Sequence, residues 1–293
     1  MGWSVCNCGA GNEGHMSRLI LLTGATGFVG RQVLRSLDEK NIRLRIIIRD
    51  GAEVPSDYSA EIENVIRTAD LFNEPVSWWE EACKGVDTII HVAWYAEPGK
   101  YLQSRKNLDC LVGTLKLAQG AIQAGVRRFT GIGTCFEYDL SQGTLSIETP
   151  IKPHSPYAAA KAAAYVELSQ CLPSENIEFC WCRLFYLSGD GEDVRRLVPS
   201  IRARRSTGEP AVLSSGTQVR DYLDVAQAGR LIAEVALSTK QGAINICSGV
   251  PITVRELAEK IADEYGRRDL LWFGEREDNP VDPPYVVGIT NSL

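Results

Sequence analysis

The chain has 293 residues, of which 44% are hydrophobic and 23% charged, and this is the composition of a globular protein with one large or two modest domains. Its net charge of −6 comes with no dense basic cluster, and no apolar run approaches the length of a membrane helix, so neither nucleic acid nor membrane is an expected partner. Nine cysteines without paired spacing and three histidines disfavour a disulfide framework and a metal site, and we expect free thiols in a cytoplasmic protein.

The first residues differ from the rest of the chain. Residues 1–16 are polar and glycine-rich, and they lack the basic start and apolar centre of a signal peptide. Gly14, His15 and Met16 look like a cloning junction. We therefore expect residues 1–16 to be a tag or a disordered leader.

Strand-like and helix-like segments alternate from residue 18 onward, which is typical of a parallel sheet with helices on both faces. The expected strands are 19–22, 43–48, 65–66, 87–93, 127–133 and 177–185, and the expected helices are 27–39, 76–84, 101–124 and 156–172. The predicted fold class is therefore α/β, with a doubly wound (Rossmann) parallel sheet.

This order fails after residue 185 and returns only between residues 223 and 247, where a helix precedes a strand. The segments on either side of that stretch contain prolines, broken helices and isolated strands. We predict a dinucleotide-binding domain at 17–185, which 216–248 rejoins, and a smaller C-terminal substrate-binding lobe made of 186–215 and 249–293.

A glycine-rich turn follows the first expected strand. Gly24, Gly27 and Gly30 separate an apolar run from an amphipathic stretch with helical spacing. In such a turn the backbone N–H groups and the helix dipole face a pyrophosphate, and the missing Cβ atoms allow its close approach. A turn that merely joins two packed elements is the alternative. The context favours a dinucleotide site, with contacts from Gly24, Thr26, Gly27, Phe28, Val29 and Gly30.

The residues that follow the next strands indicate which dinucleotide binds. Arg49 ends the second strand, where a cation accommodates the 2′-phosphate of NADP and an acid would bond the 2′-hydroxyl of NAD. We therefore favour NADP (NADPH) over NAD, with Asp50 at the ribose as the alternative. Asp70 and Leu71 follow the third strand and are placed to meet the adenine, although an Asp there is also a common turn residue. After the fourth strand, small Ala93 lets the chain pass close to the cofactor.

Tyr157 and Lys161 are four residues apart in a predicted helix, so they share one face. A lysine ammonium beside a phenol favours the phenolate, and Tyr157 could then exchange a proton with a sugar or alcohol oxygen near neutral pH. An exposed helix pair is the alternative that this spacing alone leaves open. Thr134 follows the fifth strand, at the end of the sheet where ligands bind in such folds, and its hydroxyl can hydrogen-bond the same oxygen.

Together these residues resemble the extended short-chain dehydrogenase/reductase family, in its branch of nucleotide-sugar epimerases, dehydratases and 4-ketoreductases. The similarity runs from about residue 17 to residue 290. Its motifs are Thr-Gly-x-x-Gly-x-x-Gly at 23–30, Thr134, Tyr157 with Lys161, His91-Val92-Ala93 with Trp94 in place of a second alanine, Tyr101 to Thr114 with Asn107 near the active site, Arg220-Asp221-Tyr222, residues 245–249, and Arg276. The resemblance implies that Trp94 lies at the cofactor and that Arg220 and Arg276 bind the nucleotide of the substrate.

Departures from the family pattern narrow the expected reaction. Cys135 and Phe136 replace the Asp-Glu acid/base pair of the 4,6-dehydratases, and the Cys and His of the GDP-fucose synthase type are also missing. Tyr186 replaces the Asn of an Arg-x-x-Asn pattern that usually contacts the substrate. Phe136 and Tyr186 are therefore expected to line the sugar pocket.

What remains, by resemblance, is reduction of a nucleoside-diphosphate 4-keto-6-deoxyhexose at C4 by NADPH, in deoxysugar or glycan biosynthesis. Tyr157 would protonate the carbonyl oxygen and Thr134 would orient it. Lys161 would hold the nicotinamide ribose and keep Tyr157 acidic.

Three other functions stay open. A UDP-hexose 4-epimerase would use the same triad but keep NAD bound, and Arg49 argues against it. A reductase of a non-sugar carbonyl would not need Arg220 and Arg276. An NADP-sensing protein without catalysis would have no use for the retained Tyr–Lys pair. By resemblance, the two long predicted helices would pair across a homodimer.

Overall fold

The computed structural model describes residues 18–37, 42–56, 58, 60–279 and 282–291. The leader expected at residues 1–16 lies outside this part of the chain. Within it, none of the helices combines the length and the apolar character that crossing a membrane requires. The seven cysteines of the described residues are all free thiols.

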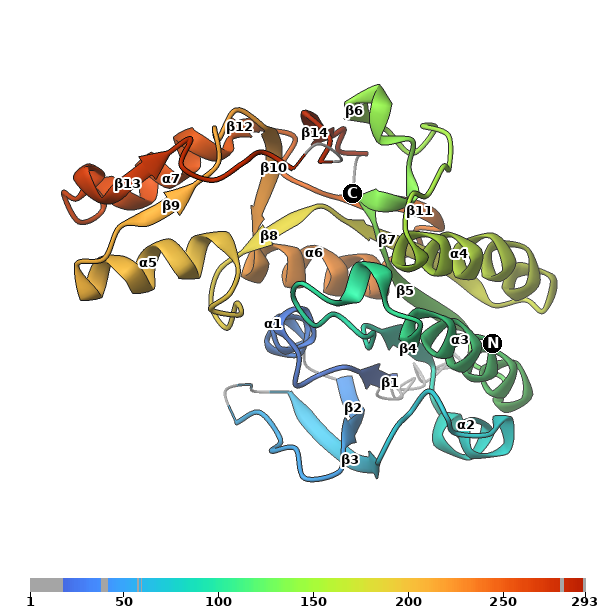
Figure 1. Ribbon diagram of the computed structural model, residues 1–293. Helices are drawn as coiled ribbons and strands as arrows, with labels where there is room; N and C mark the ends of the chain where they lie inside the picture. The colour runs from blue at the N-terminus through green and yellow to red at the C-terminus, as the bar shows by residue number, and fades with distance from the viewer. Residues whose placement is uncertain (1–17, 38–41, 57, 59, 280–281, 292–293) are drawn as a thin grey trace, which may run out of the picture.

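A seven-stranded parallel sheet forms the centre of the molecule (Figure 1). Its strands, in spatial order, are β11 (Gly242–Ile246), β7 (Glu178–Leu184), β5 (Arg128–Thr134), β4 (Thr88–His91), β1 (Arg18–Thr23), β2 (Ile42–Arg49) and β3 (Glu61–Thr68). The direction of winding reverses between β1 and β4, which is the position where open α/β sheets bind their ligands. The predicted doubly wound α/β fold is confirmed.

Helices cover both faces of this sheet. One face carries α1 (Phe28–Ser36) and α6 (Val225–Leu237), and the other carries α2 (Val76–Cys83), α3 (Lys106–Ala124) and α4 (Pro156–Ser174). The continuous apolar run of β1 serves both faces, because successive side chains of a strand point to opposite sides. Ile20 and Leu22 pack with Val33 of α1, whereas Leu21 packs with Trp79 of α2. Each fully buried side chain of this kind contributes about 1.5–3 kcal/mol to folding.

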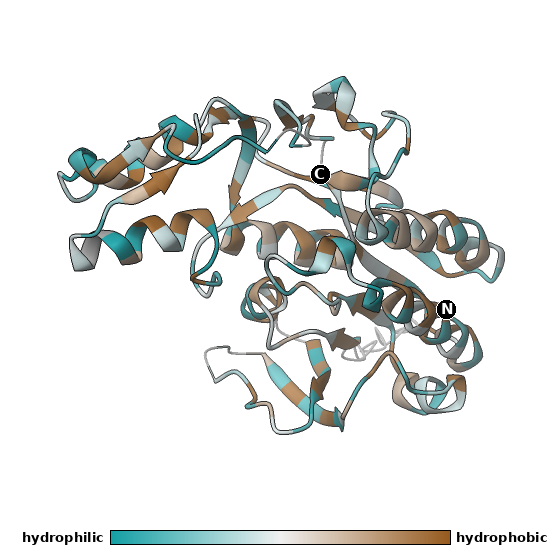
Figure 2. Ribbon diagram, viewed as in Figure 1, coloured by the Kyte–Doolittle hydropathy of each residue, from teal (hydrophilic) through white to brown (hydrophobic). Residues whose placement is uncertain are grey.

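Strand β3 is longer than the two residues predicted for it. It spans Glu61–Thr68 at the edge of the sheet, and only Thr68 of the strand is fully buried. Figure 2 shows hydrophobic and hydrophilic residues mixed along β3. The apolar pair Val65 and Ile66 predicted only part of this strand, because polar residues such as Glu61, Glu63 and Asn64 interrupt the apolar ones along the rest of it.

The long helix predicted at 101–124 is divided. A 3₁₀ turn, η1 (Tyr101–Gln103), precedes α3, which begins at Lys106. The Asn107 Nδ2 donates hydrogen bonds to the carbonyl oxygens of Tyr101 (2.6 Å) and Ser104 (2.9 Å). These bonds stabilise the break, because a side chain that occupies backbone acceptors competes with a continuous helix.

A smaller lobe lies beyond the carboxyl ends of the large sheet (Figure 1). Its main sheet has the order β12 (Pro251–Thr253), β10 (Val219–Asp224), β14 (Tyr285–Gly288) and β6 (Thr144–Leu145), with β8 (Tyr186–Ser188) also paired to β10. A two-stranded sheet of β9 (Ala211–Leu213) and β13 (Leu271–Phe273) packs with α5 (Leu197–Thr207) and α7 (Val254–Asp263). Short 3₁₀ turns are η2 (Cys135–Glu137), η3 (Leu140–Gln142) and η4 (Arg268–Leu270).

Strand pairing differs from the predicted chain segments in two places. β10 falls within 216–248, which we assigned to the dinucleotide-binding domain, but it hydrogen-bonds to β12 and β14 in the smaller lobe. β6 falls within 17–185 and pairs with β14. The division of the chain into two functional domains stays a prediction.

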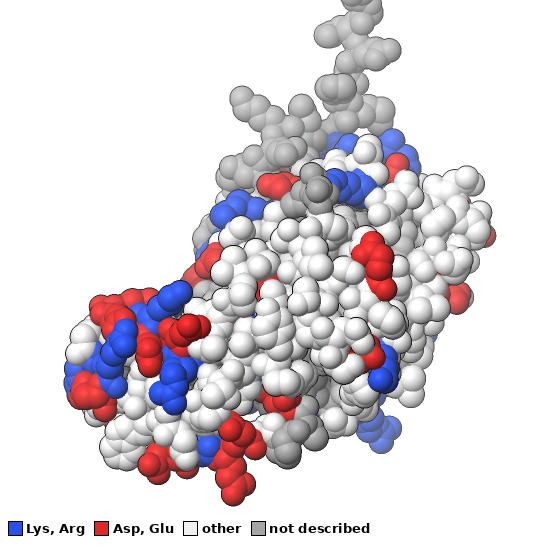
Figure 3. All heavy atoms as spheres, turned by 90° about the horizontal axis from the view of Figure 1, so that it is seen from above, with Lys and Arg blue, Asp and Glu red and all other residues white. Residues whose placement is uncertain are grey.

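Charged side chains of both signs gather over the end of the molecule that α5, α7 and η4 form (Figure 3). They are paired: Arg268 with Glu259 and Asp263, and Arg267 with Asp269. Because positive and negative groups alternate there, the surface carries no field of a single sign.

Candidate active site

A cavity of about 910 Å³ opens at the carboxyl ends of the large sheet, facing the smaller lobe. Most of the predicted site residues line it: Gly24, Thr26, Gly27, Phe28, Val29, Gly30, Arg49, Asp70, Leu71, Ala93, Trp94, Thr134, Phe136, Tyr157, Lys161 and Tyr186. Asn107, Arg220 and Arg276 do not line it. The structure thus brings together, from segments far apart in the sequence, nearly all the residues that the motifs indicated.

The glycine turn between β1 and α1 depends on two of its glycines for its shape. Gly24 has a φ of 77°, and a Cβ there would lie 2.7 Å from the backbone nitrogen of Ala93. A Cβ on Gly30 would collide with the carbonyl oxygen of Gly24. The first turn of α1 has no side-chain cap at Gly27, so its amide groups face the cavity with the positive end of the helix dipole. This geometry fits the pyrophosphate of a dinucleotide.

The far end of the cavity contains the residues expected at the adenosine. Arg49 is exposed, lines the cavity, and has no ion pair or side-chain hydrogen bond within the described part of the chain. Asp50, the alternative ribose partner, is not part of the lining. Asp70 lines the cavity and also closes its own turn, since its carboxylate accepts from Phe72 N (3.1 Å) and from Asn73 Nδ2 (3.0 Å).

The α4 helix begins one residue before Tyr157 because of its local sequence. The Ser155 hydroxyl accepts from the backbone nitrogen of Ala158 (3.2 Å), and Pro156 occupies the first helical position. The Tyr157 ring meets the ring of Tyr101 edge to face, with 4.8 Å between centroids. This packing fixes the direction of the phenol into the cavity.

Burial raises the pKa of Tyr157, with a smaller contribution from the neighbouring Tyr101, while a hydrogen bond with Thr134 acts in the opposite direction. In the structure described here burial dominates and Lys161 is not among the groups that act on this phenol, so the predicted lowering of the Tyr157 pKa is not seen; the roles of the two residues stay predictions. The consequence is that the phenol holds its proton at neutral pH, as a proton donor must.

Lys161 is almost fully buried and lines the cavity. Its Nζ donates to the carbonyl oxygen of Ile132 (2.5 Å) and lies 3.7 Å from the centre of the Trp94 ring. Burial lowers the pKa of Lys161 to about 7, although Glu137 and Cys110 act to raise it. The ammonium is therefore directed to a backbone carbonyl and an aromatic face, and not to Tyr157.

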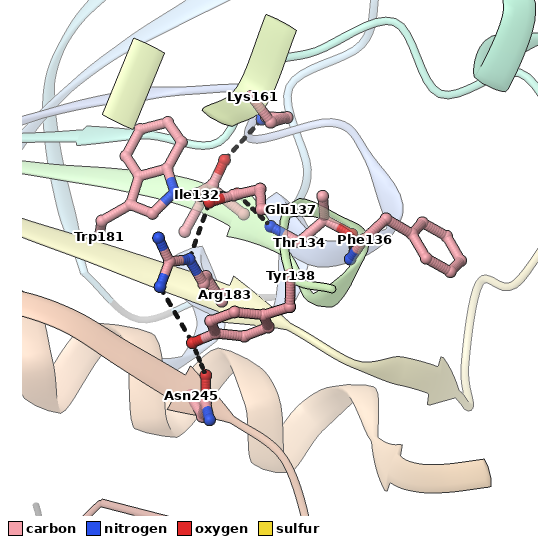
Figure 4. A network of polar contacts seen from close by, with 9 residues as sticks. All are labelled: Ile132, Thr134, Phe136, Glu137, Tyr138, Lys161, Trp181, Arg183 and Asn245. Carbon is pink, nitrogen blue, oxygen red and sulfur yellow. Dashed lines mark hydrogen bonds and ion pairs between the residues drawn. The ribbon is translucent and has the colours of Figure 1, made fainter. Parts of the chain in front are cut away.

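Thr134 ends β5 and begins the η2 turn, and a buried carboxylate holds this turn in place (Figure 4). Glu137 is fully buried, and its Oε1 accepts from the backbone nitrogen of Thr134 (2.8 Å) and from Trp181 Nε1 (3.0 Å). Its Oε2 pairs with Arg183 Nε at 2.7 Å. Sequence reasoning missed Glu137, yet Thr134 and Glu137 have the spacing of a capping box, which was the available signal.

The same network continues into the smaller lobe (Figure 4). Arg183 Nη1 donates to the hydroxyl of Tyr138 (3.0 Å), which donates to Asn245 Oδ1 (2.7 Å). Asn245 Nδ2 then donates to the carbonyl oxygens of Leu145 (3.0 Å) and Ile289 (3.1 Å). A continuous chain of hydrogen bonds therefore joins the turn at Thr134 to the strands of the smaller lobe.

Aromatic side chains line the end of the cavity near Thr134. The rings of Phe136 and Tyr186 meet edge to face with centroids 6.0 Å apart, and the ring of Tyr222 lies 5.7 Å from that of Tyr186. Burial raises the pKa of Tyr222 to about 12, so its phenol is neutral. This end of the cavity offers ring faces and hydroxyl groups to a ligand.

The two arginines predicted to bind the substrate nucleotide lie elsewhere. Arg220 is buried behind Tyr186, where it forms an ion pair with Asp282 (2.7 Å), and Arg276 is exposed away from the cavity. Arg196, which the motifs did not indicate, does line the cavity, with its guanidinium 6.0 Å from the Tyr101 ring. No sequence pattern signalled it, because it follows the irregular segment after β8.

Asn107 and His91 support the site from behind. Asn107 is buried, and its Oδ1 accepts from the indole nitrogen of Trp94 (2.9 Å). His91 bridges the hydroxyls of Thr23 and Thr114, at 2.9 Å each, and its burial lowers its pKa to about 3. A neutral histidine that is fully hydrogen-bonded in the sheet is a structural residue. In the described part of the chain, no group of three or more His, Cys, Asp or Glu side chains is arranged to hold a metal ion.

The chain is similar to known proteins along most of its length. The sequence profile described as the NAD dependent epimerase/dehydratase family matches residues 20–247. A dTDP-6-deoxy-L-talose 4-dehydrogenase (NAD(+)) of Aggregatibacter actinomycetemcomitans is 26% identical over 250 residues, which cover 84% of this chain and 90% of that protein. A dTDP-glucose 4,6-dehydratase of Streptomyces niveus is 26% identical over 264 residues, which cover 84% of this chain and 77% of that protein.

Solved structures share the fold. A UDP-N-acetylglucosamine 4-epimerase from Methanobrevibacter ruminantium M1, in complex with UDP-N-acetylmuramic acid, superposes with a TM-score of 0.79. It is 23% identical, and the match covers 94% of this chain and 90% of that one. At this identity the likeness shows the fold alone.

Proposed function

The chain belongs to the NAD dependent epimerase/dehydratase family, and we propose that it is an NADPH-dependent reductase of a nucleoside-diphosphate 4-keto-6-deoxyhexose, converting the C4 carbonyl into an alcohol. At the coarser level it is an NAD(P)-dependent enzyme of the extended short-chain dehydrogenase/reductase type that modifies nucleotide sugars. The curated relatives include enzymes named for oxidation at C4 and for 4,6-dehydration of such sugars.

The turn after Thr134 is the observation that favours reduction over dehydration. Cys135 is buried and burial raises the pKa of its thiol, Phe136 is apolar, and the carboxylate of Glu137 is occupied by Thr134, Trp181 and Arg183. The carboxylates that line the cavity, Asp70, Glu192 and Asp193, belong to loops after β3 and β8 instead. Elimination of water across C5–C6 needs an acid and a base at the sugar, and this turn supplies neither.

The residues at the cavity suffice for one proton transfer at one oxygen. Tyr157 is protonated at neutral pH and donates its proton to the carbonyl oxygen of the sugar. The Thr134 hydroxyl hydrogen-bonds the same oxygen, which fixes its position and supports the charge that develops there. The buried Lys161 ammonium holds a ribose hydroxyl of the cofactor. When bound, NADPH supplies the hydride that reduces the carbonyl carbon.

The glycine turn and Arg49 support the choice of cofactor. The tight turn that Gly24 and Gly30 allow, together with the uncapped start of α1, fits a pyrophosphate. Arg49 presents a guanidinium without an ion-pair partner among the described residues at the adenosine end, which suits a 2′-phosphate. The relative from A. actinomycetemcomitans is named for NAD(+), so the preference for NADP rests on Arg49.

The lining of the other end supports a nucleotide sugar as substrate. Phe136 and Tyr186 offer aromatic faces to a deoxysugar, whose C6 methyl group is apolar. Arg49 and Arg196 are the arginines of the cavity lining, and because we assign Arg49 to the cofactor, we assign Arg196 to the diphosphate of the substrate. Arg220 and Arg276 would need to move in order to bind the diphosphate of the substrate.

We also propose a homodimer. Exposed apolar side chains lie on α3 and α4, which are neighbours in Figure 1: Leu108 is 64% exposed, Val112 44% and Val166 55%. Pairing of these helices with a second copy would bury them. Light scattering on the wild type and on Leu108→Glu tests this: the wild type should have the mass of two chains and the variant the mass of one, whereas a monomeric wild type would contradict the proposal.

The function itself is tested by following NADPH oxidation with a panel of freshly prepared nucleoside-diphosphate 4-keto-6-deoxyhexoses. UDP-glucose without added cofactor is run separately. NADPH consumption on a keto sugar supports the reductase and identifies its nucleotide. Formation of UDP-galactose in the second reaction, without NADPH consumption in the first, would make the protein a 4-epimerase.

A further inference from the structure

Lys161 is held by a group that the family resemblance does not provide. Its side chain is 3% exposed, and within the described residues no carboxylate lies within ion-pair distance of its ammonium. The ammonium has three neighbours instead: the carbonyl oxygen of Ile132 at 2.5 Å, the face of the Trp94 ring at 3.7 Å and, further away, the Trp181 ring at 5.8 Å (the bond to Ile132 is drawn in Figure 4). A cation over an indole face is attracted by the negative charge of the ring centre, and the attraction strengthens where water is excluded.

The indole of Trp94 is fixed independently of the lysine. Its Nε1 donates to Asn107 Oδ1 at 2.9 Å, and Asn107 in turn donates to the carbonyl oxygens of Tyr101 and Ser104. The ring of Phe72 packs against it edge to face at 6.3 Å. The orientation of the indole ring is therefore fixed by the start of α3 and by the loop after β3, without a contribution from Lys161.

We propose that Trp94 is a positioning residue that holds the Lys161 ammonium by its indole face and keeps it charged at neutral pH, ready to donate to the bound cofactor. An ammonium has three donors. One goes to Ile132 and one faces the ring, and the third has no partner within the described residues, while Lys161 lines the cavity. The inference rests on the proposed part of Lys161 in holding the cofactor.

The charge of Lys161 needs such support because the surroundings oppose it. Burial lowers the pKa of Lys161 to about 7, so at neutral pH a small further shift decides whether the amine is charged. The titratable groups that face it are Glu137 on η2, which raises its pKa, and Cys110 on α3, whose thiol is neutral at this pH because burial raises the pKa of Cys110 to about 11. His91 on β4 is neutral at this pH. The face of the Trp94 ring attracts the charged form of Lys161 and not the neutral amine, so it raises the pKa of Lys161.

The test measures the titration of Lys161 directly, without turnover. The protein is labelled with ¹⁵N-lysine, and the Nζ shift is followed against pH by NMR in the wild type, W94F and W94L. The signal is assigned by its loss in Lys161→Met. Removing the aromatic face in W94L should lower the pKa of Lys161 by about one unit, whereas W94F, which keeps a ring, should retain most of the wild-type value.

Trp272 provides a matched control, because it is 51% exposed and is not part of the cavity lining. Lys161 in Trp272→Leu should have the same pKa as in the wild type. If W94L fails to fold, W94M fills a similar volume without a π face and serves the same test. Equal Lys161 pKa values in the wild type and in W94L or W94M would overturn the proposal.

The affinity for NADPH gives a second measurement. As the pH rises, W94L should lose this affinity at a lower pH than the wild type does, and the difference should equal the shift in the Lys161 pKa. W94F should show the wild-type dependence of affinity on pH. A pH-independent loss of affinity in W94L would show a merely structural role. If no keto sugar is reduced, the titration still decides this inference, so the two proposals fail separately.

Discussion

Replacing Glu137 by alanine should be among the most damaging single changes outside the cavity. The carboxylate accepts hydrogen bonds from Thr134 N and Trp181 Nε1 and pairs with Arg183, whose side chain is 1% exposed. Glu137→Ala leaves the Arg183 guanidinium buried without its counter-charge. Removing one partner of such a pair costs about 3–5 kcal/mol, which is a large share of the about 5–15 kcal/mol that keeps a protein folded.

Urea unfolding followed by far-UV circular dichroism measures this loss. Asp269→Ala provides the matched control, because it removes a carboxylate from the exposed ion pair with Arg267, which solvent screens, and should leave the stability close to that of the wild type. Glu137→Gln should fall between the two, since it keeps an acceptor for Thr134 N but not the charge. If Glu137→Ala is as stable as Asp269→Ala, the buried network does not hold the turn and our account of it is refuted.

Four further predictions follow from the cavity and its supports. Tyr157→Phe should lower kcat by about 10²–10⁴-fold at unchanged NADPH affinity, because the ring stays and only the proton donor is lost; loss of cofactor binding in a titration would mean that the residue is misplaced. Arg49→Ala should weaken NADPH binding at least about tenfold more than NADH binding, a difference of about 1.4 kcal/mol, and equal effects would refute the choice of NADP. Gly30→Ala should abolish cofactor binding and lower the melting temperature, since its Cβ meets the carbonyl of Gly24; a variant with wild-type affinity would contradict this. His91 has a pKa of about 3 in the folded protein against 6.5 in the unfolded chain, so its contribution to the free energy of unfolding is complete above pH 6.5 and is lost by about 1.4 kcal/mol per pH unit as the pH falls toward 3. Denaturation at several pH values should show a shallower fall of this free energy in His91→Gln than in the wild type. Identical slopes would contradict a buried, neutral His91.

Local sequence sufficed for the parts of the site that local geometry builds. The strand, turn and helix around Gly24 and Gly30 are contiguous in the chain, and so are the cap and first turn that carry Tyr157. Thr134 could be placed because the carboxyl ends of parallel strands meet at one edge of the sheet. In these places the residues that decide the structure are close together in the sequence.

The features that the sequence did not reveal depend on distant contacts. β3 was shortened because an edge strand has no continuous apolar run. The buried pair of Glu137 and Arg183 joins residues 46 apart, and no periodicity signals it. The direction of the Tyr157 pKa also follows from burial, which only the packed structure shows. Arg220 was assigned to the substrate by motif, but the partner that it meets, Asp282, lies on another segment.

Transfer of deuterium from labelled NADPH tests the central claim most directly. The enzyme is given NADPH that carries deuterium at the C4 position of the nicotinamide, on each face in turn, with each nucleoside-diphosphate 4-keto-6-deoxyhexose. One face of the cofactor should deliver deuterium to C4 of the sugar, where NMR of the product detects it. A product without deuterium at C4 from either label, or conversion of UDP-glucose with no cofactor added, would contradict it.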